Sequence, residues 1–494
     1  MAPPYERMLK STTYERMRAA HPAEFAPASV FFTQDARSAI DRRNSFRVKA
    51  ALVYEAITGH HVDDDRILGA NQLLLALAKT CRSAILASQQ KETTGNGDKE
   101  SGTPPDPKAS TPEEKVETTD EGTEAKKDKH ENEGDGHKES GTPPDPKPST
   151  PKEEKAELTD EGWDEEHKRV VDGIFLVVGF LPRLMDAIGN SDDRDDVDES
   201  FKSRHMHDIV TDVIKLENQL PLKDLLDVTG VFEGVIKATV GREEFKEVKE
   251  SITGDYKLAF TKETFGNVIH GFCWYYSPFF SKKAPDSPFK GVATDATMAA
   301  RTLLDCLHQS TVPVTGRSAP ETGGPSRLPA ARELRRSGVR LQASENGRAE
   351  VEFKEQSTTL GLPALAYDFK LATVARNLLV REYEEQSKPV TRYFQMMNEI
   401  VEDAADVRVL RRAGVVRGGS RGAQEVYELI KNIDGHATYP SVFMAMDREI
   451  EKVRQHHDKR MKNFFVRHRP GVLWASSVAA ISVVAIVAAR KKRG

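Results

Sequence analysis

The chain has 494 residues, of which 38% are hydrophobic and 30% charged, a polar composition that indicates a sizeable part outside any folded core. Residues 91–162 hold 21 Asp and Glu against 11 Lys and Arg, which leaves 61 basic and 56 acidic residues elsewhere. This remainder is only mildly basic, too weakly to indicate a nucleic-acid partner, and none is predicted. Three cysteines without a CxxC pair argue against a secreted disulfide framework and indicate a reducing compartment: Cys81, Cys273 and Cys306.

Residues 1–90 are predicted to form an N-terminal helical part of the folded domain. The first residues are charged and lack the apolar run of a signal peptide. The sequence Tyr-Glu-Arg-Met occurs at Tyr5 and again at Tyr14, which we interpret as chance or as one face of a short helix. Apolar residues at helical spacing predict a helix over residues 66–87.

Residues 91–162 are predicted to be a disordered acidic linker. They contain no Phe, Tyr or Trp, and so cannot bury enough apolar surface to offset the entropy lost on ordering. The sequence KESGTPPDPK begins at Lys99 and again at Lys138, so the segment includes a tandem duplication. Because the repeats have no core-facing positions, they do not indicate a solenoid.

Residues 163–455 are predicted to form the main helical domain. Dense apolar spacing predicts a buried helix over residues 167–188, interrupted at Pro182, and an acidic loop over residues 190–200. Alternating apolar and polar residues at 338–342 and 349–355 predict a small β-hairpin with a turn at Asn346-Gly347. Further predicted helices span residues 368–386, 390–414 (ending at Gly414) and 423–433, and a last helix starts near Ser441.

The sequence LENQLP, residues 216–221, holds a dense polar triplet between two apolar segments. We interpret it as a junction between two helices, because Pro221 disfavours helical geometry at the residue before it and suits the first turn of a new helix. Asn218 and Gln219 are then expected to satisfy backbone groups at the junction, and Glu217 to bind an arginine or exposed N–H groups.

Known catalytic patterns are missing from the chain, which has no GxSxG elbow, Walker loop or HExxH motif. No metal or cofactor is predicted, since adjacent histidines such as His60 and His61 point in different directions on a helix. The alternative to a non-enzymatic protein is an enzyme whose carboxylates meet in a cleft. The candidates for that site are Asp172, Glu217 and Glu382.

The C-terminal segment predicts a membrane anchor. Residues 471–489 carry no charge and at about 1.5 Å per residue would span roughly 28 Å, close to the hydrocarbon thickness of a bilayer. Residues 456–470 form a basic juxtamembrane segment, and residues 490–494 a basic tail with Arg490, Lys491, Lys492 and Arg493. Trp474 suits the membrane interface, and Gly471, Ala475 and Ala479 form a small-residue stripe that could pair with a second copy.

We therefore expect a single-pass, tail-anchored membrane protein with its bulk in the cytosol. The plasma membrane and the endoplasmic reticulum are the favoured locations, and a protein partner of unknown identity is expected. The predicted fold is mainly α: a multi-helix globular domain with a small β-hairpin, a disordered acidic insertion and a C-terminal transmembrane helix.

Several segments in order resemble the large plant family called domain of unknown function 247: VVDGIF at 170–175, DIVTDVIKLENQLPL at 208–222, ARELRRSGVRL at 331–341 and RNLLVREYE at 376–384. The N-terminal part lacks the Gly-Pro-Tyr-His motif of the family, and the duplicated linker is an addition. The motif residues to which we assign structural roles are Asp172, Gly173, Glu217, Asn218, Gln219, Pro221, Gly338, Arg376, Asn377, Leu378 and Glu382.

The resemblance implies a mostly helical plant protein, commonly with a C-terminal membrane segment and without established enzymatic activity. It also implies a second alternative, because relatives at the self-incompatibility loci of grasses look like pollen-side recognition determinants. The resemblance therefore supports a membrane-anchored interaction or recognition protein, with a pollen-side role as the narrower reading.

Overall fold

The computed structural model describes residues 7–95 and 163–462, except 33–37, 253–260, 262, 282–300, 314–326, 419–421, 434, 436, 439 and 441. Residues 91–95 of the predicted disordered linker are helical, so the linker prediction is wrong there. The rest of the predicted linker, the predicted membrane helix at 471–489 and the predicted basic tail lie outside the described residues. Among the described helices, none is both long and apolar enough to cross a bilayer. The described residues up to 87 and those from 163 to 462 pack into one unit.

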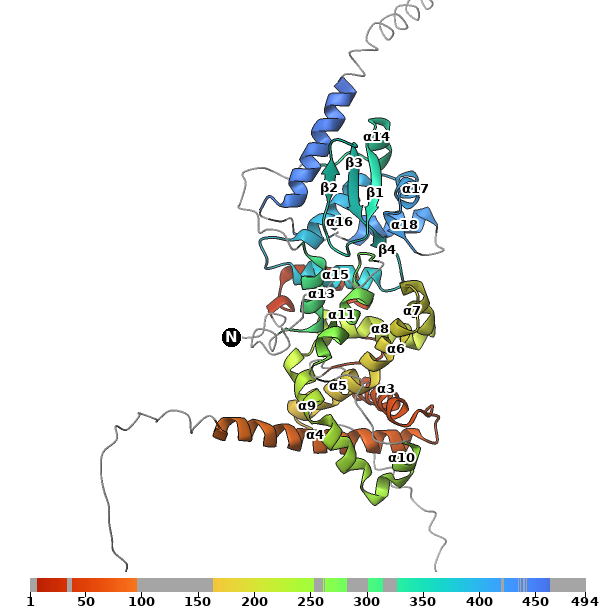
Figure 1. Ribbon diagram of the computed structural model, residues 1–494, viewed down its shortest axis with the longest axis vertical. Helices are drawn as coiled ribbons and strands as arrows, with labels where there is room; N and C mark the ends of the chain where they lie inside the picture. The colour runs from red at the N-terminus through yellow and green to blue at the C-terminus, as the bar shows by residue number, and fades with distance from the viewer. Residues whose placement is uncertain are drawn as a thin grey trace, which may run out of the picture. The chain divides into compact units, whose positions relative to one another are not determined.

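The described residues are mainly helical, as predicted (Figure 1). Before the linker, the chain forms α2 (Thr12–Ala20), η1 (Pro22–Glu24), α3 (Ala39–Thr58) and α4 (Ile67–Gly95). After it come α5 (Glu165–Ile174), η2 (Phe175–Phe180), α6 (Leu181–Gly189), α7 (Arg194–Ser200), α8 (Arg204–Ile214), η3 (Leu216–Asn218), α9 (Leu222–Val240), η4 (Glu243–Phe245), α10 (Lys246–Ser251), α11 (Phe265–Tyr276) and α13 (Leu303–Thr311).

The C-terminal part combines helices with short strands. Its elements are α14 (Ala331–Arg336), β1 (Arg340–Ser344), β2 (Glu352–Lys354), β3 (Thr359–Pro363), β4 (Leu365–Ala366), α15 (Leu371–Arg381), α16 (Pro389–Ile400), α17 (Ala404–Arg412), β5 (Val416–Arg417), α18 (Ala423–Ile433) and a last helix over residues 445–462. Helix α14 contacts β1 and α17, and α17 contacts α18 beside the sheet (Figure 1).

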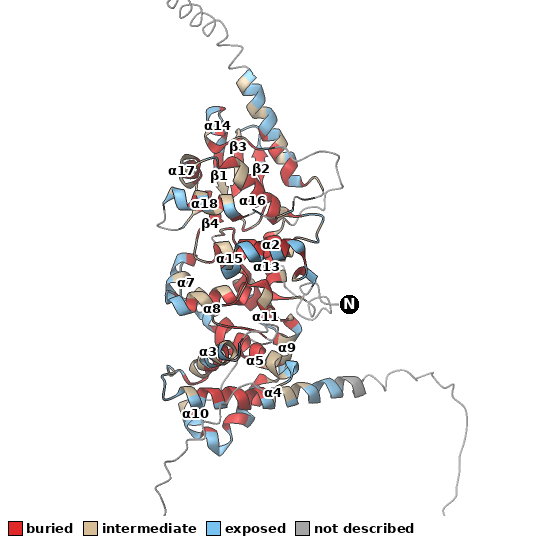
Figure 2. Cartoon of the chain, turned by 180° about the vertical axis from the view of Figure 1, so that it is seen from behind, coloured by how far each residue is buried: buried red, intermediate tan, exposed pale blue. Residues whose placement is uncertain are grey.

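The core of the helical part centres on the π-helix η2. All six of its residues are buried, and it contacts α3, α5, α6 and α9 (Figure 2). Helix α3 packs against Gly179, where an added Cβ would lie 3.4 Å from the backbone of Leu52, an ordinary van der Waals contact. The predicted helix over 167–188 is one continuous helical run made of α5, the π-helix η2 and α6, and Pro182 is the second residue of α6, just after the π-helix.

Arg82 on α4 contacts the first residues described after the linker. Its Nη2 donates to Asp164 at 2.7 Å and to Glu166 at 2.8 Å, and its Nη1 lies 2.7 Å from a ring nitrogen of His167. The acidic partners are more than half exposed, so each pair contributes little free energy. The contacts nevertheless place the start of α5 beside α4.

The predicted β-hairpin is wrong in its pairing. Strand β3 lies between the two predicted strands, parallel to β1 and antiparallel to β2, giving the order β1-β3-β2. The turn residue is correctly placed, since Gly347 has φ +70°, but it leads the chain away toward Thr311, whose carbonyl accepts the Ala349 N–H. Strand β3 takes the central position because its leucines, Leu360 and Leu362, are fully buried.

Two further segments differ from the sequence predictions. The acidic segment 190–200 is a helix, α7, over part of its length, because the Asp193 side chain accepts the N–H groups of Asp195 and Asp196 and so caps it. The predicted helix over 390–414 divides into α16 and α17, since Asp403 starts a new helix through a capping box with Asp406.

Two similar turns end α14 and α17. Gly338 and Gly414 have φ of +88° and +73°, and each follows its helix by two residues. In both turns the glycine N–H and the next N–H bond back to the last helical carbonyls, which defines a Schellman motif. Each turn then leads into a strand, β1 or β5. The predicted stop at Gly414 is confirmed.

Candidate functional site

The LENQLP segment connects two helices, as predicted. Helix α8 ends at Ile214, a single 3-10 turn follows, and α9 begins at Leu222 with Pro221 as its N-cap, one position before the expected first turn. The Gln219 amide donates to the carbonyls of Val213 at 3.1 Å and Lys215 at 2.9 Å. Its oxygen accepts the Leu304 N–H at 3.0 Å, so Gln219 also fixes the start of α13.

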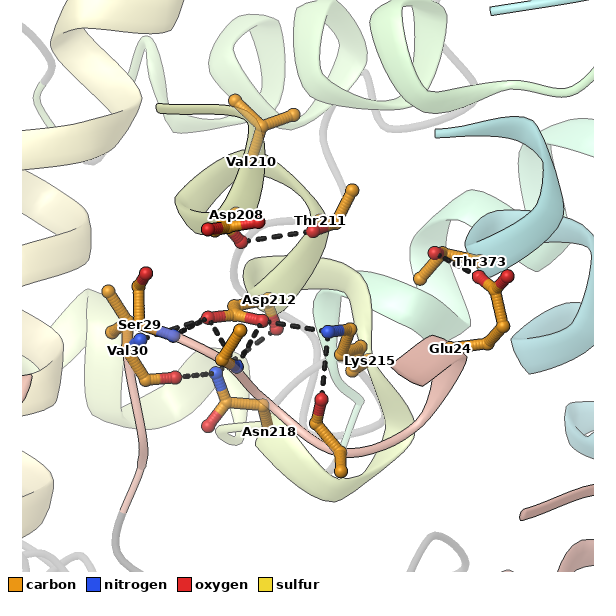
Figure 3. Close-up of polar contacts among 12 residues, drawn as sticks. Glu24, Ser29, Val30, Asp208, Val210, Thr211, Asp212, Lys215, Asn218 and Thr373 are labelled. Carbon is orange, nitrogen blue, oxygen red and sulfur yellow. Dashed lines mark hydrogen bonds and ion pairs between the residues drawn. The ribbon is translucent and has the colours of Figure 1, made fainter. Parts of the chain in front are cut away.

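Asp212, near the C-terminal end of α8, holds the N-terminal segment through main-chain hydrogen bonds (Figure 3). Its buried carboxylate accepts the consecutive N–H groups of Ala28, Ser29 and Val30 at 2.6 to 3.0 Å. The ammonium of Lys215 lies 2.9 Å from the same carboxylate and donates to the Ala26 carbonyl at 2.9 Å. The pair is therefore buried, ionic and satisfied by backbone groups.

Asn218 extends this contact by pairing with the chain in the manner of a β-strand. Its oxygen accepts the Phe32 N–H at 2.6 Å, and its nitrogen donates to the Val30 carbonyl at 2.9 Å and to the Asp212 carbonyl at 3.1 Å. The side chain is 1% exposed, so all three bonds are shielded from water. We call residues 24–32 the N-terminal strap, and Asp212, Asn218 and Asn377 the strap clamp.

Asn377 on α15 completes the clamp from the other side. Its oxygen accepts the Leu216 N–H at 2.7 Å, and its nitrogen donates to the Glu24 carbonyl at 2.8 Å. The preceding residue, Arg376, lies 3.0 Å from the Glu24 carboxylate, which also accepts from the Thr373 hydroxyl at 2.5 Å. The motif segments at 216–221 and 376–384 therefore meet at the strap.

The three candidate carboxylates have separate partners. Asp172 on α5 lies 2.5 Å from the Lys49 ammonium, and both side chains are buried. Glu217 accepts from the Tyr14 hydroxyl and from Arg18, each at 2.5 Å, so the second Tyr-Glu-Arg-Met copy contacts the LENQLP segment.

Glu382, just after α15, is fully buried. It accepts the N–H groups of Val390 at 3.0 Å and Thr391 at 2.8 Å and the Thr391 hydroxyl at 2.7 Å, and it lies 3.0 Å from the His308 ring. The contacts of the three carboxylates join different sets of elements: α5 with α3, η3 with α2, and the end of α15 with α13 and α16. Among the described residues, no group of three or more His, Cys, Asp or Glu could hold a metal ion.

The plant family DUF247, described as a plant protein of unknown function, matches residues 168–489. This range covers well over half of the chain. The chain belongs to the DUF247 family. It is also 30% identical over 138 residues to a UPF0481 protein of Arabidopsis thaliana, a stretch that is 27% of this chain and 26% of that protein. No solved structure matches the chain.

The DUF247 match begins after the strap, whereas the strap clamp lies inside it. Asp212, Asn218 and Asn377 are within residues 168–489, and the backbone groups that they hold are at residues 24–32. The DUF247 part of this chain therefore includes a site that another segment of the chain completes. The family resemblance could not predict this contact, because it is weak before residue 90.

The remaining DUF247 motif residues serve packing. Gly173 on α5 faces α9, and a Cβ at this position would lie 2.9 Å from Val228, so a larger side chain would force the helices apart. Leu378 is fully buried, and Gly338 forms the turn after α14. The membrane-anchor residues lie outside the described residues: Gly471, Trp474, Ala475, Ala479, Arg490, Lys491, Lys492 and Arg493.

Sequence reasoning missed several buried charges, including Asp212 and Lys215 of the strap clamp region and Lys49 beside Asp172. One signal was available for Asp212, which lies one residue before Val213 on the apolar face of α8. A charge on such a face is rarely buried unless it is paired. Its backbone partners are more than 180 residues earlier, so spacing alone could not identify them.

The three cysteines are buried and free, which supports the prediction of a chain without disulfides. Burial raises the pKa of the Cys81 thiol to about 12, with a smaller contribution from nearby Asp227. Burial also raises the pKa of Cys273 to about 12, and that of Cys306 well above its usual value. Such thiols are packing groups and poor nucleophiles.

Proposed function

We propose that this DUF247 protein is a non-enzymatic, membrane-anchored interaction protein. The observation that carries the proposal is the uncharged stretch of residues 471–489 with basic residues on both sides. It follows a described helix, residues 445–462, whose own sequence is rich in Lys and Arg. The bulk of the chain then lies in the cytosol, beside the plasma membrane or the endoplasmic reticulum.

The contacts of the three candidate carboxylates support the non-enzymatic part of the proposal. Asp172 is paired with Lys49, Glu217 with Tyr14 and Arg18, and the oxygens of Glu382 accept four hydrogen bonds or ionic contacts. Groups that are satisfied in this way hold the fold together, and each would have to break its contacts to take up a proton or attack a substrate. A pollen-side recognition role has no specific support in this geometry.

A fluorescent fusion to the N-terminus tests the anchor. The full chain should give membrane signal, and the chain without residues 471–494 should be diffuse at equal expression. The control is a scrambled version of residues 471–489 with the same composition, which should still localise to membranes because span length and hydropathy decide insertion. Membrane signal that persists in the truncated chain would contradict the proposal.

A further inference from the structure

The last described helix, residues 445–462, has two opposite faces of different character. On one face Met446, Ile450 and Val453 are buried. On the other face Arg448, Lys452, Gln455, Lys459 and Lys462 are all exposed. These five residues follow spacings of four and three, so at about 100° per residue they form one stripe along the helix. We call this set the basic stripe.

The apolar face is held firmly to the rest of the fold. Asp447 accepts the Met444 N–H at 3.0 Å and lies 2.6 Å from the guanidinium of Arg392 on α16, and both of these charged side chains are buried. Glu449 accepts the Phe353 N–H at 2.8 Å and so covers the outer edge of β2. The orientation of the helix, and with it the outward direction of the basic stripe, is therefore set by the folded unit.

Two of the four charges of the stripe, those of Lys459 and Lys462, are available to a partner. Lys459 and Lys462 have no ion pair among the described residues, and Lys452 is paired at 2.7 Å with Glu449 while its side chain stays 43% exposed. Glu451 and Asp458 flank the stripe and lower its potential. From residue 452 to residue 469, however, the chain has seven Lys and Arg against a single Asp. A surface of this sign favours an anionic partner.

We propose that the basic stripe is a docking surface for the anionic headgroups of the membrane in which the chain is anchored. This inference rests on the proposed function, because residues 471–489 bring the helix to a bilayer. Clusters of Lys and Arg next to a membrane span gain free energy from the negative surface potential of acidic phospholipids. The stripe thereby orients the folded unit on the membrane.

The geometry allows the whole stripe to lie on a flat surface. From Arg448 to Lys462 the stripe is about 21 Å long at roughly 1.5 Å per residue, so the helix lies along the membrane plane when all its cations touch headgroups. Residue 462 is nine residues from the start of the uncharged stretch, a reach of up to about 30 Å. This length is enough to connect a helix on the surface to a span that enters the bilayer.

The test uses the full chain reconstituted into vesicles, with an environment-sensitive dye on Gln455→Cys. The three natural cysteines are buried, so the dye attaches to the stripe. Vesicles of phosphatidylcholine alone are compared with vesicles containing about 30% phosphatidylserine, both with a quencher attached to headgroups. We expect at least twofold stronger quenching in the acidic vesicles, and loss of that difference near 1 M salt, where the screening length is about 3 Å.

Two variants with the same change in charge separate the stripe from general electrostatics. The combination Lys452→Glu, Lys459→Glu and Lys462→Glu should abolish the lipid-dependent quenching. The combination Lys223→Glu, Lys246→Glu and Lys249→Glu reverses three exposed lysines on α9 and α10 and should leave it unchanged. Equal quenching in the two kinds of vesicle, or equal loss in the two variants, would overturn the proposal.

Two other outcomes would also overturn the proposal. A chain that fails to float with any vesicle shows that the anchor itself is wrong, and the docking surface falls with it. In the second outcome the chain floats, but its dye is shielded equally in neutral vesicles and becomes accessible only after residues 91–162 are deleted. The acidic segment of the chain itself then covers the stripe. That result would replace the lipid partner by an intramolecular one.

Discussion

The exchange of Asn218 for alanine tests the strap clamp most directly. The substitution removes the acceptor of the Phe32 N–H and the donor to the carbonyls of Val30 and Asp212. Each hydrogen bond contributes about 1 kcal/mol net, and a buried group left unpaired costs roughly 1 to 3 kcal/mol. Because the side chain is 1% exposed, water cannot easily replace it, and we expect a loss of about 3 kcal/mol.

The assay is chemical unfolding of the full chain in mild detergent, combined with hydrogen exchange of the strap amides. The unfolding midpoint should fall at constant slope, and the Phe32 amide should exchange roughly a hundredfold faster, since every 1.4 kcal/mol is a factor of ten. The matched control is Glu217→Gln in the same motif. Its partner Arg18 is about half exposed, so we expect a loss below about 1 kcal/mol.

The reasoning fails if Asn218→Ala lowers the free energy of unfolding by less than about 0.5 kcal/mol while Phe32 stays protected. Such a result would mean that the strap is held by its apolar side chains alone. A large loss with an unchanged Phe32 exchange rate would also contradict it, because the damage would then lie elsewhere in the junction.

Three more predictions concern Asp212, the buried cysteines and the linker. The exchange of Asp212 for alanine should cost more than Asn218→Ala, about 4 kcal/mol, because it strands a buried ammonium and three N–H groups; equal melting temperatures for the two variants would contradict this. At pH 8 the native thiols should react very slowly with an aromatic disulfide reagent. The pKa of Cys81 and Cys273 is raised to about 12, and the reactive thiolate forms only as the pH approaches that value. Rapid reaction without denaturant would refute this prediction. Residues 96–162 can be replaced by about 12 Gly and Ser residues, a linker with a reach near 19 Å. The shorter closed loop should raise the free energy of unfolding by about 1.5 kcal/mol. A lower stability, measured by urea unfolding, would show that the segment contributes to the fold.

Local chemistry determined much of the secondary structure. Helical spacing identified the regions of α4, α15 and α18, and the glycine at 414 identified the end of α17, because these features depend on residues within one or two turns. The helix junction at LENQLP was predictable for the same reason. Two segments were misread because a single aspartate cap outweighs the pattern around it. Asp193 starts α7 inside a segment whose acidic charge predicted a loop, and Asp403 starts α17 inside a segment whose spacing predicted one long helix.

Contacts between distant segments were decided only by the tertiary structure. Strand β3 enters between β1 and β2 because two leucines are buried there, and nothing in the local turn at Asn346-Gly347 opposes that pairing. The strap clamp is a stronger case, since Asp212, Asn218 and Asn377 recognise backbone N–H and C=O groups. Every residue except proline offers both groups, so the sequence of the strap does not reveal its partners. Local sequence was enough to predict most of the helices, the family resemblance and the charged C-terminal region. The tertiary structure sets which buried polar groups meet, because hydrogen bonding to the main chain depends on position in space and hardly on residue type.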